Sequence, residues 1–189
     1  MALRAAVIGV GAMGRHHARV YDELSLTELV GVADPDPANT DLVARRLGVD
    51  TFVDHRDLLA ATRPDLVSIA VPTALHLSVA LDCLAAGAHV LVEKPIAADV
   101  DEGRALLAAA RDAGRVLTVG HIERFNPAIQ ELKRRIDAGA LGRVFEIRAR
   151  RLGPFPARIR DVGVVIDLAA HDLDIFRWIV GGEVLRVHA

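Results

Sequence analysis

The sequence predicts an α/β fold in which a doubly wound parallel sheet is followed by an incomplete α+β domain with an open sheet. Short apolar runs alternate with longer helical patterns over the first 120 residues, which is typical of a parallel sheet covered on both faces. A glycine-rich loop follows the first run. After Gly120 the pattern changes, and a strand with strictly alternating faces appears.

The predicted strands of the first part are continuous apolar runs, as expected when helices cover both faces of a sheet. Helical patterns fill the intervals, and a capping box, Asp99 with Glu102, begins the last of them. Glycines that favour a left-handed helix end follow three of the helices. The strands are expected at 5–9, 28–34, 51–53, 65–71, 89–94 and 115–120, the helices at 12–24, 37–47, 54–61, 73–86 and 99–113, and the glycines are Gly48, Gly87 and Gly114.

The second part is expected to be a separate domain, so we predict domains at 1–120 and 121–189. Its elements are a helix at 127–138, a strand at 143–151, a helix at 162–180 that is apolar nearly all round and therefore predicted to be buried, and a strand at 183–189. So few elements cannot cover both faces of a sheet. The second domain is therefore expected to be unfinished.

Composition excludes several classes of partner. The net charge is −2 and the pI is about 6.4, so the charge gives no reason to expect binding to nucleic acid or to a membrane surface. The single cysteine, Cys83, excludes an internal disulfide and fits a reducing compartment, so a cytoplasmic protein is expected. No run approaches a membrane span, and the N-terminus does not resemble a signal peptide.

The stretch GVGAMG, residues 9–14, fits G-x-G-x-x-G between a predicted strand and a predicted helix. Gly9 permits the tight turn, Gly11 lets the backbone approach a pyrophosphate, and Gly14 allows close helix–strand packing. Ala12 and Met13 complete the loop at the helix N-terminus, which favours an anion. A chance glycine cluster is the alternative, but this context predicts a dinucleotide-binding (Rossmann) domain.

Asp34 ends the second predicted strand, 20 residues beyond Gly14, where a carboxylate would bond both ribose hydroxyls of a dinucleotide. Pro35 follows it, and no arginine stands within reach in the sequence to hold a 2′-phosphate. NAD is therefore the expected cofactor, and NADP is less expected.

Lys94 is one of only two lysines in a chain with 23 basic residues, and it follows an apolar strand in VLVEKPIA. Ligands of open α/β sheets sit outside the carboxyl ends of the strands. A lysine there holds a compact charge that arginine cannot replace. A surface lysine paired to Glu93 would explain the same pattern, so both interpretations stay open.

The last predicted helix places Asp167, His171 and Asp174 at i, i+4 and i+7, on one face. A carboxylate one turn before a histidine can orient the imidazole as a general base. A core histidine with a cap-like aspartate is the alternative. A metal site is not expected, because no third ligand follows at a recognised spacing.

Several other residues are weaker candidates. Pro72 and Thr73 end the fourth strand at the same edge as Lys94, where they could contact nicotinamide or ribose, and His76 lies one turn later. His16 and His17 begin the first helix and are expected to face solvent or core rather than take part in catalysis.

Four stretches together resemble the glucose–fructose oxidoreductase, inositol dehydrogenase and MocA-like (Gfo/Idh/MocA) family of NAD(P)-dependent sugar dehydrogenases. The resemblance covers essentially the whole chain, and the last two stretches look most like the branch that oxidises UDP-N-acetylglucosamine-type sugars at C3. The stretches are GVGAMG, residues 65–95, GHIERFNPA (120–128) and VIDLAAHDLDI (165–175).

The resemblance implies roles residue by residue. Glu93-Lys94-Pro95 matches the Glu-Lys-Pro motif, whose lysine lies beside nicotinamide and substrate and whose Lys–Pro bond is often cis. Asp167 and His171 match the aspartate and the acid/base histidine. Pro72 and His76 match the Pro-x-x-x-His that lines the cofactor. The candidate substrate-binding residues are Lys94, Arg124, Arg160 and His171.

The predicted function is NAD-dependent oxidation of a sugar or nucleotide-sugar hydroxyl to a ketone, by a homo-oligomer formed through the second-domain sheet. His171, held by Asp167, would remove the hydroxyl proton, and Lys94 would stabilise the oxyanion. Family members continue well past residue 189, so the activity of this chain is an open question. The alternative is a non-catalytic NAD-binding module that associates through its open sheet.

Overall fold

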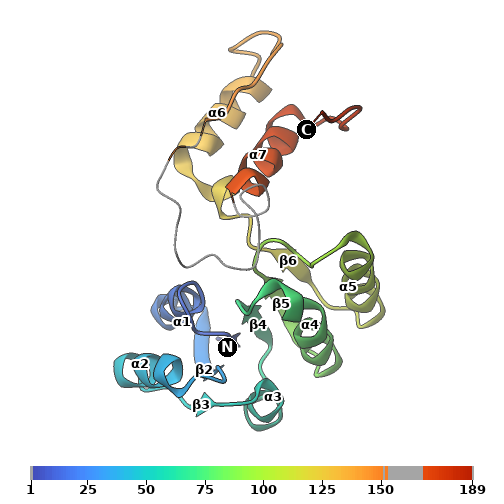
Figure 1. The fold of residues 1–189 in the computed structure, drawn as a ribbon. Coiled ribbons are helices and arrows are strands. Elements are labelled where there is room, and N and C mark those ends of the chain that lie inside the picture. Colours follow the sequence, from blue (N-terminus) through green and yellow to red (C-terminus); the bar gives the residue numbers. More distant parts are fainter. Residues whose placement is uncertain (1, 151, 153–167, 189) are drawn as a thin grey trace. The chain divides into compact units, whose positions relative to one another are not determined.

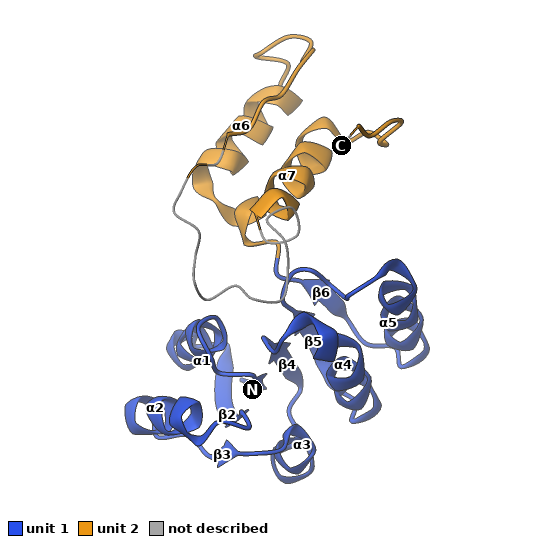
Figure 2. Cartoon of the chain, viewed as in Figure 1, with its two compact units in different colours: residues 1–120 blue, residues 121–189 orange. Residues whose placement is uncertain are grey.

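The computed structural model describes residues 2–150, 152 and 168–188. By the distribution of its internal contacts the chain divides into two compact units, Met1–Gly120 and His121–Ala189 (Figure 2). Arg160 and Asp167 lie outside the described residues. Across the described part of the chain, no helix is long and apolar enough to cross a bilayer.

The first unit is built on a six-stranded sheet in which every pair of neighbours is parallel (Figure 1). The strand order is β3-β2-β1-β4-β5-β6. From β1 the chain adds β2 and β3 on one side and then β4, β5 and β6 on the other, so the strand order switches between β1 and β4. Ligands of such sheets bind outside the carboxyl ends of the strands at this switch point. The strands are β1 Leu3–Ile8, β2 Thr27–Ala33, β3 Thr51–Phe52, β4 Leu66–Ile69, β5 His89–Val92 and β6 Leu117–Val119.

Helices cover both faces of this sheet, so the expected doubly wound architecture is confirmed. Helices α1 and α2 pack together over one face, while α3 contacts α4 and α4 contacts α5 over the other (Figure 1). Each face has its own buried apolar cluster: Val7, Val32 and Val43 belong to one, and Leu58 and Leu106 to the other. The helices are α1 Gly14–Glu23, α2 Pro37–Leu47, α3 His55–Thr62, η1 Thr73–Leu75, α4 His76–Ala85 and α5 Val100–Asp112.

The helix ends follow the local chemistry of the sequence. The Asp99 carboxylate accepts the Glu102 N–H at 2.9 Å and the Glu102 carboxylate accepts the Ala98 N–H at 3.1 Å, which confirms a reciprocal cap at the start of α5. The three predicted terminal glycines adopt φ angles between 62° and 86°, where an L side chain is disfavoured. They are Gly48, Gly87 and Gly114.

The second unit contains η2 Ile122–Phe125, α6 Pro127–Asp137 and α7 Ala170–Val180. Two predictions are wrong here. Residues 143–150 and 183–188 form no strand, because a strand needs a neighbour for its backbone hydrogen bonds and no described segment pairs with them. Helix α7 is not buried all round: Ile175 and Ile179 are buried, but Leu173 and Val180 are exposed. Residues 162–167 of the predicted helix lie outside the described part.

Candidate functional site

The glycine loop has the geometry of a phosphate-binding turn. Gly9 has a φ of 81°, and a Cβ there would lie 2.7 Å from the Ala70 carbonyl oxygen. A Cβ on Gly14 would lie 1.7 Å from the Gly9 carbonyl oxygen, so only glycine fits where α1 meets the loop. A Cβ on Gly11 would meet nothing within 4 Å, which leaves open space above the loop for a pyrophosphate.

The N-terminus of α1 is suited to an anion. Met13 occupies the cap position with no capping side-chain bond, and no acidic residue lies in the first turn. Both Ala12 and Met13 are exposed. The partial positive charge of the helix end is therefore not offset by a local carboxylate.

Asp34 is fixed just beyond β2 by three donors. Its Oδ2 accepts the Val10 N–H at 2.8 Å, and its Oδ1 accepts the Asp36 N–H at 2.9 Å and the Asn39 side-chain amide at 3.2 Å. An ionised carboxylate offers about four lone-pair positions. One position therefore stays available, enough for one ribose hydroxyl without the loss of a present bond. The sequence predicts bonds to both hydroxyls, and the second hydroxyl would have to displace one of the three donors.

A pocket of about 310 Å³ lies beside Asp34 and Gly9. Sequence reasoning found Asp34 but missed residues that the β3–α3 connection brings to the same pocket. Since β3 is the neighbour of β2 in a parallel sheet, the ends of both strands meet at one edge, and this topology could have revealed them. The residues supplied by that connection and its helix are Val53, Asp54, His55 and Arg56.

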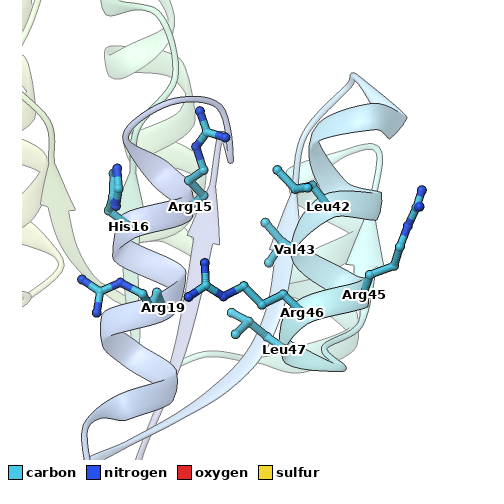
Figure 3. Close-up of a pocket in the computed structure, with 8 residues that line it drawn as sticks. All are labelled: Arg15, His16, Arg19, Leu42, Val43, Arg45, Arg46 and Leu47. Atoms are coloured by element: carbon cyan, nitrogen blue, oxygen red, sulfur yellow. The ribbon is translucent and has the colours of Figure 1, made fainter.

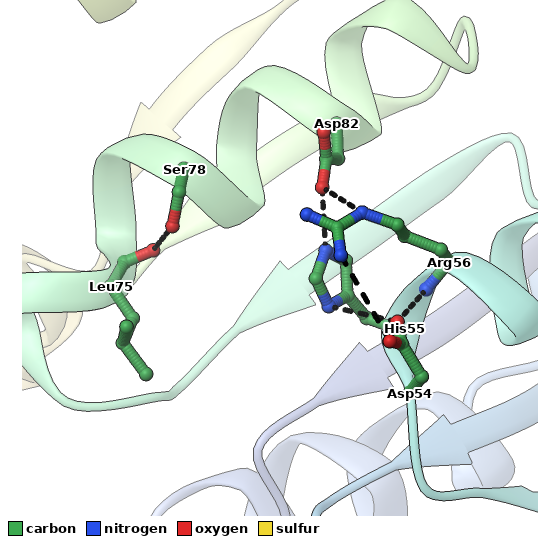
Figure 4. Close-up of polar contacts among 6 residues, drawn as sticks. All are labelled: Asp54, His55, Arg56, Leu75, Ser78 and Asp82. Carbon is green, nitrogen blue, oxygen red and sulfur yellow. Dashed lines mark hydrogen bonds and ion pairs between the residues drawn. The ribbon is translucent and has the colours of Figure 1, made fainter.

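Arg56 adds to the cofactor argument: no arginine follows Asp34 closely in the sequence, but the fold brings Arg56 to the same pocket. The guanidinium is already engaged: Nε donates to Asp82 Oδ2 at 2.9 Å, and Nη1 lies 3.9 Å from Asp54 Oδ2 (Figure 4). His55 Nε2 lies 2.8 Å from the same Asp82 oxygen. The preference for NAD therefore depends on an arginine that two carboxylates hold rather than on the absence of one.

Lys94 lies beyond the end of β5, half-buried, and its peptide bond to Pro95 is cis. The Glu93 carboxylate contacts His17 Nε2 at 2.9 Å and accepts the Lys94 backbone N–H at 3.2 Å. Burial by itself raises the pKa of Glu93, but the hydrogen bond and charge of His17, with the Lys94 N–H and its ammonium, hold it below the ordinary value.

The motif that ends β4 places its three residues differently. Pro72 is exposed and Thr73 half-buried, at the carboxyl edge of the sheet. His76 is only 1% exposed, and its two ring nitrogens lie 2.9 Å from the Pro95 carbonyl oxygen and 3.1 Å from that of Val71. We predicted that His76 lines the cofactor; the structure places its ring as a clamp between the β4 and β5 ends.

In the second unit, Arg124 pairs with Asp174, and its side chain is 42% exposed. Two guanidinium nitrogens contact the two carboxylate oxygens at 2.7 and 2.5 Å, and His121 Nδ1 lies 3.7 Å from Asp174. The fork ties η2 to α7. His171 lies half-buried in the first turn of α7, and its predicted partner Asp167 lies outside the described residues. No group of three potential metal ligands occurs within the described ranges.

A second hollow, of about 460 Å³, lies between α1 and α2 of the first unit (Figure 3). Four arginines and a histidine line it over an apolar floor that includes Val43 and Leu47, and the head of Arg46 points across it toward α1. It shares no lining residue with the pocket at Asp34. This cluster of basic residues is therefore separate from the expected ribose site. Its basic residues are Arg15, His16, Arg19, Arg45 and Arg46.

Comparison with known families agrees with this geometry. Residues 3–121 match the model of the oxidoreductase family with an NAD-binding Rossmann fold, and residues 129–189 match the GFO/IDH/MocA C-terminal domain. The chain belongs to the GFO/IDH/MocA oxidoreductase family. Its first unit is an NAD-binding Rossmann domain, and the resemblance read from the four sequence stretches is confirmed.

Individual relatives are sugar and inositol dehydrogenases. The chain is 40% identical over 187 residues to UDP-N-acetylglucosamine 3-dehydrogenase of Acidithiobacillus ferrooxidans, covering 99% of this chain and 57% of that protein. It is 33% identical to scyllo-inositol 2-dehydrogenase (NAD(+)) of Bacillus subtilis, covering 98% and 56%. A crystal structure of the A. ferrooxidans enzyme superposes with a TM-score of 0.85 at 38% identity, covering 97% and 58%. The chain thus spans somewhat more than half the length of these relatives.

Proposed function

We propose that this protein is an NAD-dependent dehydrogenase that oxidises a secondary hydroxyl of a sugar or nucleotide sugar to a ketone. The observation that carries the proposal is the placement of Lys94 in the NAD-binding unit. It follows β5 at the carboxyl edge of the sheet, the edge that also carries the glycine loop and Asp34.

The first unit would bind and orient the dinucleotide. The loop backbone and the N-terminus of α1 hold the pyrophosphate, and Asp34 accepts a ribose hydroxyl. When bound, NAD supplies an acceptor for the hydride that leaves the carbinol carbon. The Lys94 ammonium stabilises the negative charge that develops on the substrate oxygen, an electrostatic contribution that is often the largest in catalysis.

The second unit would supply the base. As the alcohol is oxidised to a ketone, His171 would take the hydroxyl proton, while the hydride of the carbinol carbon would leave for the bound cofactor. Asp167, one turn before His171 in the sequence, would orient the imidazole. Arg124 donates to Asp174 through Nε and Nη2, and its remaining N–H groups would be the ones to contact the substrate.

A nucleotide sugar is the substrate class that the comparisons favour. The relative at 40% identity is a UDP-N-acetylglucosamine 3-dehydrogenase, whereas the inositol dehydrogenase relatives are between 31% and 34% identical. UDP-N-acetylglucosamine is therefore the first substrate to test, followed by scyllo-inositol and myo-inositol.

The experiment follows NADH absorbance after NAD and one candidate substrate are mixed with the protein. We expect turnover with UDP-N-acetylglucosamine and slower or no turnover with the inositols. NAD binding in a fluorescence titration without turnover on any of the three would support the alternative, a non-catalytic NAD-binding module.

A further inference from the structure

The two residues that flank Lys94 are each held by a histidine from a different helix. His17 of α1 contacts the Glu93 carboxylate at 2.9 Å, and His76 of α4 contacts the Pro95 carbonyl oxygen at 2.9 Å. The sequence gives no hint of the first contact, because 76 residues separate its partners. The short segment that carries Lys94 is therefore anchored on both sides.

The contact between His17 and Glu93 is well enclosed. The two side chains are 19% and 15% exposed. The missing side chain of Gly120 makes room on the other side, because a Cβ there would lie 3.0 Å from the Glu93 carboxylate. The second carboxylate oxygen accepts the Lys94 N–H at 3.2 Å. A shift of the Glu93 carboxylate would therefore also displace the Lys94 backbone.

His17 lies on the helix that follows the glycine loop. It lies three residues after Gly14, in the first turn of α1, the helix whose N-terminus closes the glycine loop. Its neighbour His16 is exposed and lines the arginine-rich hollow instead. One of two adjacent histidines thus connects the cofactor loop to the segment that carries Lys94.

We propose that His17 is a positioning residue that fixes Lys94 through the Glu93 carboxylate and couples the NAD-binding helix to the catalytic segment. The inference deepens the proposed function and, in its kinetic form, rests on it. A histidine suits the task because its ring nitrogen donates to an ionised carboxylate, a bond stronger than one between neutral groups. The lowered pKa of Glu93 keeps that carboxylate ionised well into the acid range.

The kinetic test compares His17→Ala and His17→Gln with the control His16→Ala. We expect His17→Ala to lower kcat about tenfold or more, equivalent to about 1.4 kcal/mol of lost transition-state stabilisation, with little change in sugar KM. His17→Gln retains an N–H donor and should recover part of kcat, and His16→Ala should match the wild type. Unchanged kcat in His17→Ala, or a loss that His17→Gln does not reduce at all, would overturn the proposal.

A second measurement needs no turnover and therefore separates this inference from the proposed function. The chain has two lysines, Lys94 and Lys133, so brief labelling with acetic anhydride and mass spectrometry reports Lys94 against an internal reference on α6. We expect His17→Ala to change the Lys94 to Lys133 labelling ratio about twofold or more, a change in the environment of the amine worth about 0.4 kcal/mol. An unchanged ratio in a folded His17→Ala protein would contradict the proposal even if the wild type turns out to be inactive.

Discussion

The two units differ in how many of their predicted strands form. In the first, each strand has a parallel neighbour and two apolar clusters close over the sheet. In the second, only helices form within the described residues, and Phe145, Leu185 and Val187 are between 77% and 95% exposed. A helix makes its backbone hydrogen bonds within itself, whereas a strand requires a partner. An alternating pattern therefore predicts a strand only where a neighbour exists.

The largest effects should divide the chemistry between the units. We expect Lys94→Ala in the first unit and His171→Ala in the second each to lower kcat by about 10²-fold or more, because the proposed mechanism gives each residue a role at the substrate hydroxyl. NAD affinity should stay nearly intact in both, as measured by fluorescence titration. Unchanged turnover in either variant would remove that residue from the mechanism, and a large loss of NAD affinity in His171→Ala would break the division.

The stability of the first unit should depend on the loop glycine at α1. We expect Gly14→Ala to lower the free energy of unfolding by about 3 kcal/mol, since its Cβ would lie 1.7 Å from the Gly9 carbonyl oxygen and the backbone would have to move. Gly11→Ala is the matched control, because its Cβ meets nothing within 4 Å, and it should affect NAD affinity more than stability.

Urea unfolding can follow the two units separately in these variants. The single tryptophan, Trp178, lies in α7 and reports the second unit, while far-ultraviolet circular dichroism is dominated by the first. A Trp178 transition that shifts as much as the circular dichroism in Gly14→Ala would show that the units unfold together.

Cofactor choice should depend on Asp34 and on the arginine beside it. We expect Asp34→Ala to weaken NAD about tenfold, the loss of a hydrogen bond to a charged acceptor, and to weaken NADP less. Asp82→Asn should improve NADP binding in that background, because the loss of the negative charge weakens the 2.9 Å bond that holds Arg56. Equal losses for NAD and NADP in Asp34→Ala would undo the preference. Asp112→Asn, exposed at the end of α5 and not part of this pocket's lining, is the control.

The smallest effect should come from the ion pair of the second unit. We expect Asp174→Asn to lower the stability of that unit by about 1–2 kcal/mol, measured by Trp178 fluorescence, because Asp174 is 10% exposed and would leave Arg124 with a weaker partner. Asp137→Asn, which breaks an exposed pair with Lys133, should cost under about 0.5 kcal/mol. Equal costs for the two variants would show that burial of Asp174 adds nothing.

The pH dependence of this pair has a definite sign. Burial alone raises the pKa of Asp174, but Arg124, with His121 and Arg177, holds it below the ordinary value of 3.8. A carboxyl whose folded pKa is lowered stabilises the fold above its unfolded pKa, and the contribution is lost as pH falls through the lowered folded value. The difference between wild type and Asp174→Asn should therefore persist down to about pH 4 and shrink only below it. A difference that disappears already near neutral pH would contradict this assignment.

The parts of the fold and site that the sequence predicted are those with a local cause. Gly9, Gly14 and Asp34 could be placed because a turn, a helix start and a strand end fix their surroundings within a few residues. Contacts across the sheet could not, since His17 and Arg56 meet partners 76 and 26 residues away. His76 was found by resemblance, but its burial between two carbonyl oxygens depends on how three segments pack.

Gly120 constrains the design of chimeric proteins built from the first unit. The residue at which the first unit ends is also the one whose absent side chain leaves space for Glu93. A chimera that joins this nucleotide-binding half to a foreign partner domain should keep glycine at the seam and change the chain only from His121 onward. Even an alanine at position 120 would place its Cβ 3.0 Å from the Glu93 carboxylate. Glu93 would then have to shift next to Lys94, and the hybrid would fold but lose activity.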